Sequence, residues 1–273
     1  MPEAPEMQVV AEFLDSHLPG RTIQEARVLK SSVVRSLCGN LDEDLAGRTF
    51  ERIRREGKFL LMALSGGRHI VINPKLTGGL QHCASKTRVQ KRTCVRMKLE
   101  GGVDLRYTDD RQMGQFYYVQ SSQVDEAPGF AEQGPDALDD FSFDEFTDRL
   151  KGFHGEIKGI LTRGRVISGI GNAYADEILF DAKVYPFKRR KALSNDELRR
   201  IHQSSRRVIV ESVERVRERM GDRIDHKVRD FLKVHNRGGE PCPRCGKKIT
   251  ELRANQRITS YCRSCQPGML LKN

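Results

Sequence analysis

Four cysteines near the C-terminal end of the chain constrain its fold more than any other feature. They form two C-x2-C pairs separated by sixteen residues: Cys242, Cys245, Cys262 and Cys265. Two such pairs at this distance predict a tetrahedral zinc site, which is structural because protein ligands fill all four positions. The metal would hold a module too small for a core of its own. A zinc ribbon used only for protein contacts has the same ligands, but the arginine density of this module argues against it.

The balance of charges indicates a polyanionic partner. The 273 residues include 48 Lys and Arg against 37 Asp and Glu, a net charge of +11. Such an excess is typical of nucleic-acid-binding proteins, although a soluble enzyme can also be basic. No apolar run approaches the 18 or so residues of a membrane span, and the start lacks a signal-peptide pattern. We therefore expect a cytoplasmic, nucleoid-associated protein, whose three other cysteines are reduced and structural.

The first half of the chain predicts a β-rich domain with a leading helix. Apolar residues at helical spacing from Pro5 to Leu18 predict an amphipathic helix, which Pro19-Gly20 ends. Between Arg21 and Gln120 short β-rich runs separated by glycine turns predict an antiparallel sandwich or barrel. These runs cover residues 22–29, 49–54, 59–64, 69–72, 94–99, 103–107 and 115–119. A short helical turn near Asp42 to Leu45 is the exception.

The second half contains an acidic stretch and then a helical region. The acidic stretch from 121 to 148 contains Pro-Gly and Gly-Pro pairs, so we expect a linker that faces away from a polyanion. Short helices follow at 143–150 and 156–161, and Ser194 with Glu197 predicts a capping box for a long amphipathic helix. We place the domains at residues 1–122, a linker at 123–141, a helical domain at 142–235 and the zinc module at 236–273.

Three short motifs carry candidate chemistry. If Met1 is removed, Pro2 presents a secondary amine beside the carboxylate of Glu3, and such an amine can form an iminium with a sugar carbon. A helix start would lower the pKa of that amine, although Pro and Glu also describe the first turn of an ordinary helix. Lys58 follows a Glu-Gly turn and could point at a phosphate, or be an ordinary solvated lysine. The glycine-rich turn before Asn172 could form an anion site at a helix start that Asn172 caps.

Together these motifs resemble the formamidopyrimidine-DNA glycosylase and endonuclease VIII (Fpg/Nei) family over essentially the whole chain. The resemblance rests on Pro2-Glu3 with Pro5-Glu6, the Lys58 hairpin, the turn at 169–175, and residues 256–259 before the last cysteine pair. It implies an α+β multidomain fold. An N-terminal β-sandwich with its leading helix would be followed by a helix-two-turn-helix domain and a zinc-finger hairpin, with DNA bound between the two halves.

The resemblance also implies a bifunctional DNA glycosylase and abasic-site lyase. Pro2 would attack C1′ of the damaged nucleoside, Glu3 would serve acid-base steps, and β- and δ-elimination would follow. The nucleotide must be flipped from the duplex. Phosphates around it would be gripped by Lys58, Asn172 and Arg257, and Lys158 matches a lysine of the family's helical domain. One structural Zn²⁺, no catalytic cofactor, damaged duplex DNA as partner and a monomeric state are implied.

Departures from the family pattern bear on the lesion. The positions that fill the gap left by the flipped base hold Leu76, Arg111 and Met113, where oxidised-purine enzymes typically have Met, Arg and Phe. Asn73 stands where a phosphate-binding His is common. The segment from Met220 to Phe231 looks shorter than the loop that covers 8-oxoguanine, so we expect 8-oxoguanine to be a poor substrate. A non-catalytic zinc-containing DNA-binding protein of the same fold is the alternative.

Overall fold

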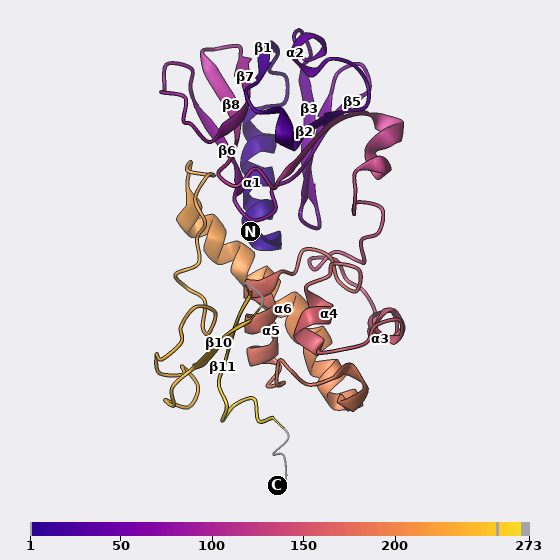
Figure 1. The fold of residues 1–273 in the computed structure, drawn as a ribbon, viewed down its shortest axis with the longest axis vertical. Helices are drawn as coiled ribbons and strands as arrows, with labels where there is room; N and C mark the ends of the chain where they lie inside the picture. The colour runs from indigo at the N-terminus through magenta and orange to yellow at the C-terminus, as the bar shows by residue number, and fades with distance from the viewer. Residues whose placement is uncertain (1, 255–256, 269–273) are drawn as a thin grey trace. The chain divides into compact units, whose positions relative to one another are not determined.

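The computed structural model describes residues 2–254 and 257–268 of the chain (Figure 1). It divides into two compact units: Met1–Glu132 with Val216–Val228, and Gln133–Arg215 with Arg229–Asn273. Within the described residues no helix combines the length and the apolar character needed to cross a membrane.

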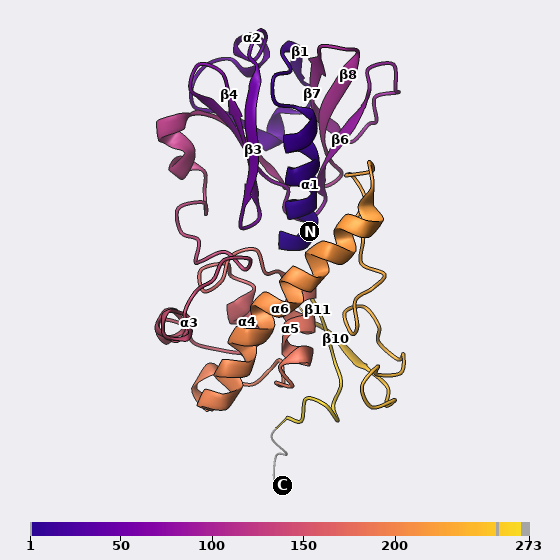
Figure 2. The same cartoon turned by 180° about the vertical axis from the view of Figure 1, so that it is seen from behind.

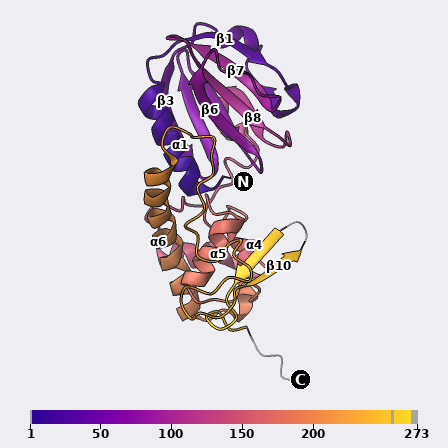
Figure 3. The ribbon, with the colours of Figure 1, turned by 90° about the vertical axis from the view of Figure 1, so that its left-hand side faces the viewer.

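The first unit contains two β-sheets (Figures 1 and 3). One has the order β1-β7-β8-β6 and is antiparallel throughout: β1 (Ile23–Val28), β7 (Thr93–Leu99), β8 (Val103–Asp109) and β6 (Gly78–Ala84). The other has the order β2-β9-β5-β4-β3: β2 (Val34–Ser36), β9 (Gln115–Gln120), β5 (Arg68–Asn73), β4 (Phe59–Leu64) and β3 (Phe50–Glu56). The 3-10 turn η1 (Ser31–Val33) and the short helix α2 (Leu41–Asp44) complete this part.

The predicted β-sandwich is confirmed, with three differences in detail. Every predicted β-rich run overlaps a strand, but β2 and β6 were not predicted. Strand β6 begins with Gly78-Gly79, which resembled a turn; Gly78 is needed because a Cβ there would lie 2.4 Å from the Tyr107 hydroxyl oxygen. Strand β2 is only three residues long, and it pairs with β9 in parallel, so the second sheet is mixed.

Helix α1 (Ala4–His17) packs against β3 and β4 (Figure 2). Its spacing places Met7, Val10 and Leu14 on one buried face, as the helical period requires. Leu18 is the C-cap and Gly20 follows with φ +82°, so the predicted end of this helix is confirmed.

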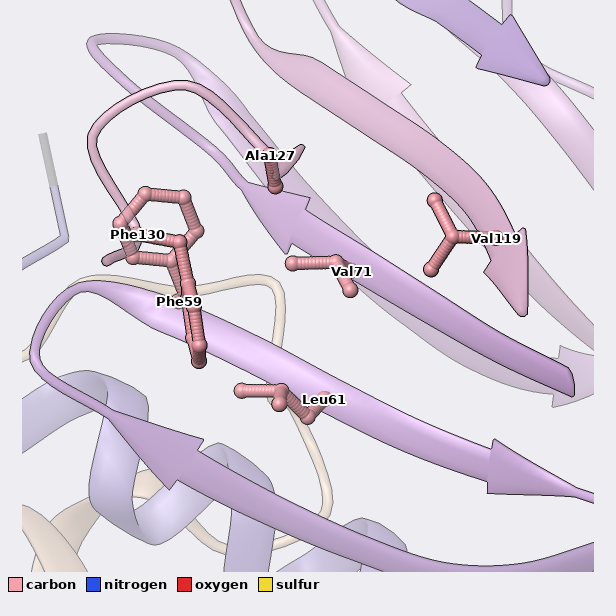
Figure 4. Close-up of a cluster of buried hydrophobic side chains, with 6 residues drawn as sticks. All are labelled: Phe59, Leu61, Val71, Val119, Ala127 and Phe130. Carbon is pink, nitrogen blue, oxygen red and sulfur yellow. The ribbon is translucent and has the colours of Figure 1, made fainter. Parts of the chain in front are cut away.

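The acidic stretch after β9 begins as packed structure rather than as an open connection. After the 3-10 turn η2 (Ser121–Glu126), Ala127 and Phe130 join a buried cluster on the second sheet (Figure 4). The Phe130 ring meets the Phe59 ring edge-on, with the centroids 5.3 Å apart. The chain therefore covers the outer side of β4 and β5 before it leaves the first unit.

The second unit is helical and ends in a β-hairpin. Its elements are α3 (Phe143–Lys151), α4 (Ile157–Leu161), α5 (Asn172–Asp181), η3 (Arg190–Ala192), α6 (Asn195–Met220), β10 (Thr250–Ala254) and β11 (Arg257–Tyr261). The predicted capping box is present, because Ser194 N–H donates to Glu197 (2.8 Å) and Glu197 N–H donates to Ser194 Oγ (3.3 Å). The last residues of α6, from Val216, group with the first unit.

One carboxylate links helix α2 to the second sheet of the first unit. Asp44 accepts hydrogen bonds from Arg48, from Arg68 of β5 (3.2 Å) and from the Tyr118 hydroxyl of β9 (2.5 Å). Partial burial tends to raise the pKa of Asp44, but the bonds from Tyr118, Arg48 and Arg68 outweigh it and lower that pKa to about 2.

The linkage makes the stability of the first unit depend on pH. Because the folded-state pKa of Asp44 lies below the unfolded value of about 3.9, its contribution is present above pH ~4 and is lost as the pH falls towards 2. We expect Asp44→Asn to lower the free energy of unfolding by about 1–2 kcal/mol at pH 7. The deficit should shrink between pH 4 and pH 2 in urea titrations. The exposed Glu51→Gln is the control, and a deficit independent of pH would contradict the assignment.

Candidate functional site

The two residues predicted to react first lie at the N-terminal end of α1. Pro2 is buried, and Glu3 is the N-cap residue of the helix with only 1% of its surface exposed. Glu3 N–H donates to the Glu6 carboxylate (2.9 Å) within a capping box. The positive end of the helix dipole favours a carboxylate at this place. In the translated chain Met1 is bonded to the Pro2 nitrogen, so the amine exists only after Met1 has been removed.

A small cavity lies beside Pro2. Helix α1, the strands β4 and β6, and the segment that follows α6 line it, with Glu6, Tyr107 and Ile224 among its walls. Its volume is about 30 Å³, enough to hold a water molecule.

The segment after α6 lines that cavity and contacts the rest of the first unit. Met220 and Ile224 are 5% and 4% exposed. Lys227 Nζ donates to the Leu76 carbonyl (3.0 Å), and Asp225 lies 3.7 Å from Arg92. The segment that the sequence identified as short therefore packs beside Pro2.

The Lys58 hairpin is tied to α1. Gly57 and Lys58 form the two-residue turn between β3 and β4, and Gly57 has φ +57°, which suits the first position of a type II′ turn. Arg55 donates to the Gly57 carbonyl (2.8 Å) and to Gln8 Oε1 of α1 (2.9 Å). Lys58 itself is half-buried. The arginine thus fixes the tip of the Lys58 hairpin relative to the helix that starts at Pro2.

The residues predicted to fill the gap in DNA lie on two loops that the structure brings together. Leu76 belongs to the loop between β5 and β6, and Arg111 and Met113 to the loop between β8 and β9. Leu76 is 39% exposed and Met113 52% exposed. Asn73 lies at the end of β5, where its Oδ1 accepts the N–H of Lys75 (3.2 Å). It therefore stabilises the turn that carries Leu76.

A buried carboxylate that the sequence did not identify joins these loops. Asp109 is fully buried and accepts from the Thr77 hydroxyl, from Arg111 N–H (3.2 Å) and from Gly114 N–H (2.7 Å). Threonine and aspartate are common turn residues, so neither stands out in the sequence. Only the sheet register, which pairs Gly78 with Asp109, places the two turns side by side.

In the second unit the structure gathers three predicted residues around one groove. Lys158, Asn172 and Arg257 line it together with Glu156, Phe187 and Thr259, and its volume is about 370 Å³. Asn172 does not cap α5, as the sequence had suggested: Gly171 is the N-cap, and Asn172 Nδ2 donates to the Ile258 carbonyl (2.7 Å). Asn172 thereby connects the start of α5 to β11.

Lys158 is held in a buried polar cluster. It is 6% exposed, and its Nζ lies within hydrogen-bonding distance of Asp176 (2.7 Å), of the Ile258 carbonyl (2.6 Å) and of Thr259 Oγ1 (2.9 Å). Asp176 also lies 2.7 Å from His235 Nδ1. These contacts make Lys158 a residue that positions β11 and the neighbouring Arg257.

The four cysteines form a site with the dimensions of a zinc centre. Their sulfur atoms all lie within 4.8 Å of one another. Cys242 and Cys265 are 3.9 Å apart, and Cys245 and Cys262 are 3.5 Å apart. Disulfide sulfurs would be about 2.05 Å apart, whereas Zn–S bonds of about 2.3 Å in a tetrahedron place sulfurs about 3.8 Å apart. The geometry therefore fits a tetrahedral metal.

Comparison with known families covers all three parts of the chain. Residues 1–116 match the formamidopyrimidine-DNA glycosylase N-terminal domain, residues 133–223 match its H2TH domain, and residues 239–268 match a zinc finger found in FPG and IleRS. The chain belongs to the formamidopyrimidine-DNA glycosylase family.

Relatives and solved structures agree with this family. The formamidopyrimidine-DNA glycosylase of Desulforamulus reducens is 34% identical over 97% of this chain and 99% of its own length, and that of Pelotomaculum thermopropionicum has the same values. The Lactococcus lactis Fpg in complex with DNA containing an abasic site is 25% identical, with a TM-score of 0.88 over 97% of this chain and 100% of that chain. The L. lactis Fpg bound to DNA containing N7-benzyl-Fapy-dG has a TM-score of 0.86 at 26% identity, over 98% and 100% of the two chains.

These matches confirm the family, the α+β multidomain fold with a helix-two-turn-helix region, and the structural zinc site. The finger is also anchored to the rest of the second unit. Gln266 accepts from Cys262 N–H (3.0 Å) and donates to the Val184 carbonyl (2.9 Å), and Arg244 donates to the Phe180 carbonyl (2.9 Å). The metal therefore fixes the hairpin of β10 and β11, which carries Arg257.

Removal of the metal should unfold this module alone. We expect one Zn²⁺ per chain by metal analysis, and we expect Cys245→Ser or a strong chelator to expose the amides of residues 239–268 to hydrogen exchange. The strands of the first unit should keep their protection. Cys38→Ser, which changes a cysteine outside the cluster, is the control. An unchanged exchange pattern after complete zinc removal would contradict a structural role.

Proposed function

We propose that the protein is a bifunctional DNA glycosylase and abasic-site lyase of base-excision repair, acting as a monomer on damaged duplex DNA. The observation that carries the proposal is the placement of Pro2 and Glu3 at the buried start of α1, beside a small cavity. Membership of the family supports it, and so do relatives solved with DNA that contains an abasic site or Fapy-dG.

The chemistry follows from a secondary amine. The Pro2 nitrogen attacks C1′ and the damaged base leaves; at an abasic site the amine adds to the C1′ aldehyde and water leaves. Either route gives an iminium at C1′, which acidifies the C2′ protons. Loss of one C2′ proton expels the 3′ phosphate, and a second elimination expels the 5′ phosphate. Glu3 carries protons during opening of the sugar ring. The iminium is the electron sink, so the sequence of steps needs no catalytic metal or organic cofactor.

The other predicted residues have supporting roles. Lys58, Asn172 and Arg257 bind the phosphates around the flipped nucleotide, and Lys158 supports the last two from its buried cluster. Leu76, Arg111 and Met113 enter the gap in the duplex, where the exposed apolar side chains are covered by bases. Asn73 shapes the loop that carries Leu76.

The segment after α6 bears on the lesion. The stretch from Met220 to Phe231 looks shorter than the loop that covers 8-oxoguanine in oxidised-guanine enzymes, and its residues Met220 and Ile224 lie buried beside Pro2. We therefore propose abasic sites, ring-opened purines, oxidised pyrimidines or another lesion as substrates rather than 8-oxoguanine.

Covalent trapping tests the chemistry. Borohydride reduction on a duplex with one abasic site should link the protein to DNA through Pro2, because reduction of the iminium fixes the C–N bond. Pro2→Gly should reduce the adduct strongly, and a variant that retains Met1 should give none. Wild-type protein that binds the duplex but yields no adduct with any lesion would favour the alternative of a non-catalytic DNA-binding protein.

A panel of duplexes tests the lesion. Under single-turnover conditions we expect 8-oxoguanine to be removed at least tenfold more slowly than an abasic site is cleaved, a difference of about 1.4 kcal/mol in the barrier. Ile224→Ala enlarges the cavity. It should reduce the difference between the two rates, because it should accelerate base removal alone. The matched change Ile53→Ala, buried elsewhere in the first unit, controls for lost stability. Equal rates for the two substrates would refute the proposed preference.

A further inference from the structure

The loop between β6 and β7 has an unusual course. Strand β8 lies between these two strands and is antiparallel to both, so β6 ends beside Val103 whereas β7 begins beside Thr108 (Figure 3). Residues 85–92 must therefore run back along the length of β8. Their bonds follow this path: Ser85 N–H donates to the Gly102 carbonyl (2.8 Å), and Asp109 N–H donates to the Arg92 carbonyl (2.8 Å). We call these residues the crossover loop.

A fully buried ion pair fixes the middle of the crossover loop. Arg106 of β8 has no exposed surface and donates to the carbonyls of Thr87 (2.8 Å) and Arg88 (3.3 Å). Asp104, also fully buried, accepts from Arg106 (2.7 Å) and from Ser85 Oγ (2.6 Å). Such a pair is costly to bury unless its geometry and hydrogen bonds are complete. It holds the loop backbone in one shape.

The side chains that this backbone displays are basic. Residues 85–92 contain Lys86, Arg88, Lys91 and Arg92 and no acidic residue. Lys86, Arg88 and Lys91 are exposed. A run of charge is often only a solvated surface, but here a buried arginine, which makes no contact with solvent, sets the positions of these exposed charges.

The crossover loop ends beside the residues proposed to enter DNA. Arg92 lies 3.5 Å from Asp110, the residue before Arg111, and its carbonyl accepts from Asp109, which joins the two loops described above. Strand β8 spans seven residues, so the loop extends about 20 Å away from that end. The same length covers about six phosphates along one strand of B-DNA.

We propose that the crossover loop is a second DNA-backbone contact, in which Lys86, Arg88 and Lys91 bind phosphates of the duplex on one side of the lesion. This rests on the proposed function, because it takes the loops of Leu76 and Met113 to mark where the lesion lies. The loop binds by charge and reads no base. Its effect is on affinity and on the salt dependence of binding.

The test compares variants of the full chain for binding to a duplex with one abasic-site analogue. Lys86→Ala/Arg88→Ala/Lys91→Ala should weaken binding about tenfold or more at 50 mM salt and lower the slope of log K against log salt by about 2–3, near 0.9 per lost phosphate contact. Shortening the duplex on one side of the lesion should abolish the difference from wild type, and shortening the other side should preserve it.

Two controls isolate the loop. Arg54→Ala/Arg149→Ala/Lys151→Ala removes the same charge from exposed positions already paired with acidic residues, so its binding should resemble wild type. Lys86→Arg/Arg88→Lys/Lys91→Arg keeps the charge and should retain affinity. Equal affinity and slope for the loop variant and wild type would overturn this inference. A wild-type protein that shows the loop effect but never forms a borohydride adduct would instead sink the proposed chemistry.

Discussion

The proposed attack by the Pro2 amine requires the start of the chain to be held in place, and the packing of α1 provides this. The helix buries Met7, Val10 and Leu14 against the strands β3 and β4, so its first turn cannot fray without exposing core. The capping box between Glu3 and Glu6 then fixes the residue that follows Pro2. Terminal residues are ordinarily among the least ordered of a domain. Here the hydrophobic face of one helix turns the terminus into a defined position.

Four carboxylates each connect segments that are distant in the sequence. Asp44, Asp104, Asp109 and Asp176 each accept a hydrogen bond from a group far away in the sequence. Each carboxylate therefore connects a loop or short element to a strand or helix. Local propensity alone would not hold that loop or element in place. Three of the four, Asp104, Asp109 and Asp176, hold elements that carry the proposed DNA contacts: the crossover loop, the two loops with exposed apolar side chains, and strand β11. Rigid loops lose less entropy when they bind, which favours affinity.

The sequence predicted regular elements well and polar long-range contacts poorly. The helix from Pro5, the capping box at Ser194 and the zinc cluster were predictable because their signals lie within a few residues of one another. Strand β6 was missed because its opening glycines serve a close approach to Tyr107, a residue some thirty positions away. The burial of Lys158 against Asp176 depends on how α4 and α5 pack, which no local pattern encodes. The role of Asp109 depends on sheet register, which no local pattern encodes.

The proposed sugar chemistry and the proposed lesion preference rest on different parts of the structure. Pro2 and Glu3 are placed by α1, whereas the segment after α6 lines the cavity beside Pro2. The proposed attack of the Pro2 amine on C1′ thus depends on the placement of α1, whereas the proposed lesion preference depends on the segment after α6. Since an abasic site needs no base pocket at all, it is the proposed substrate that this arrangement restricts least.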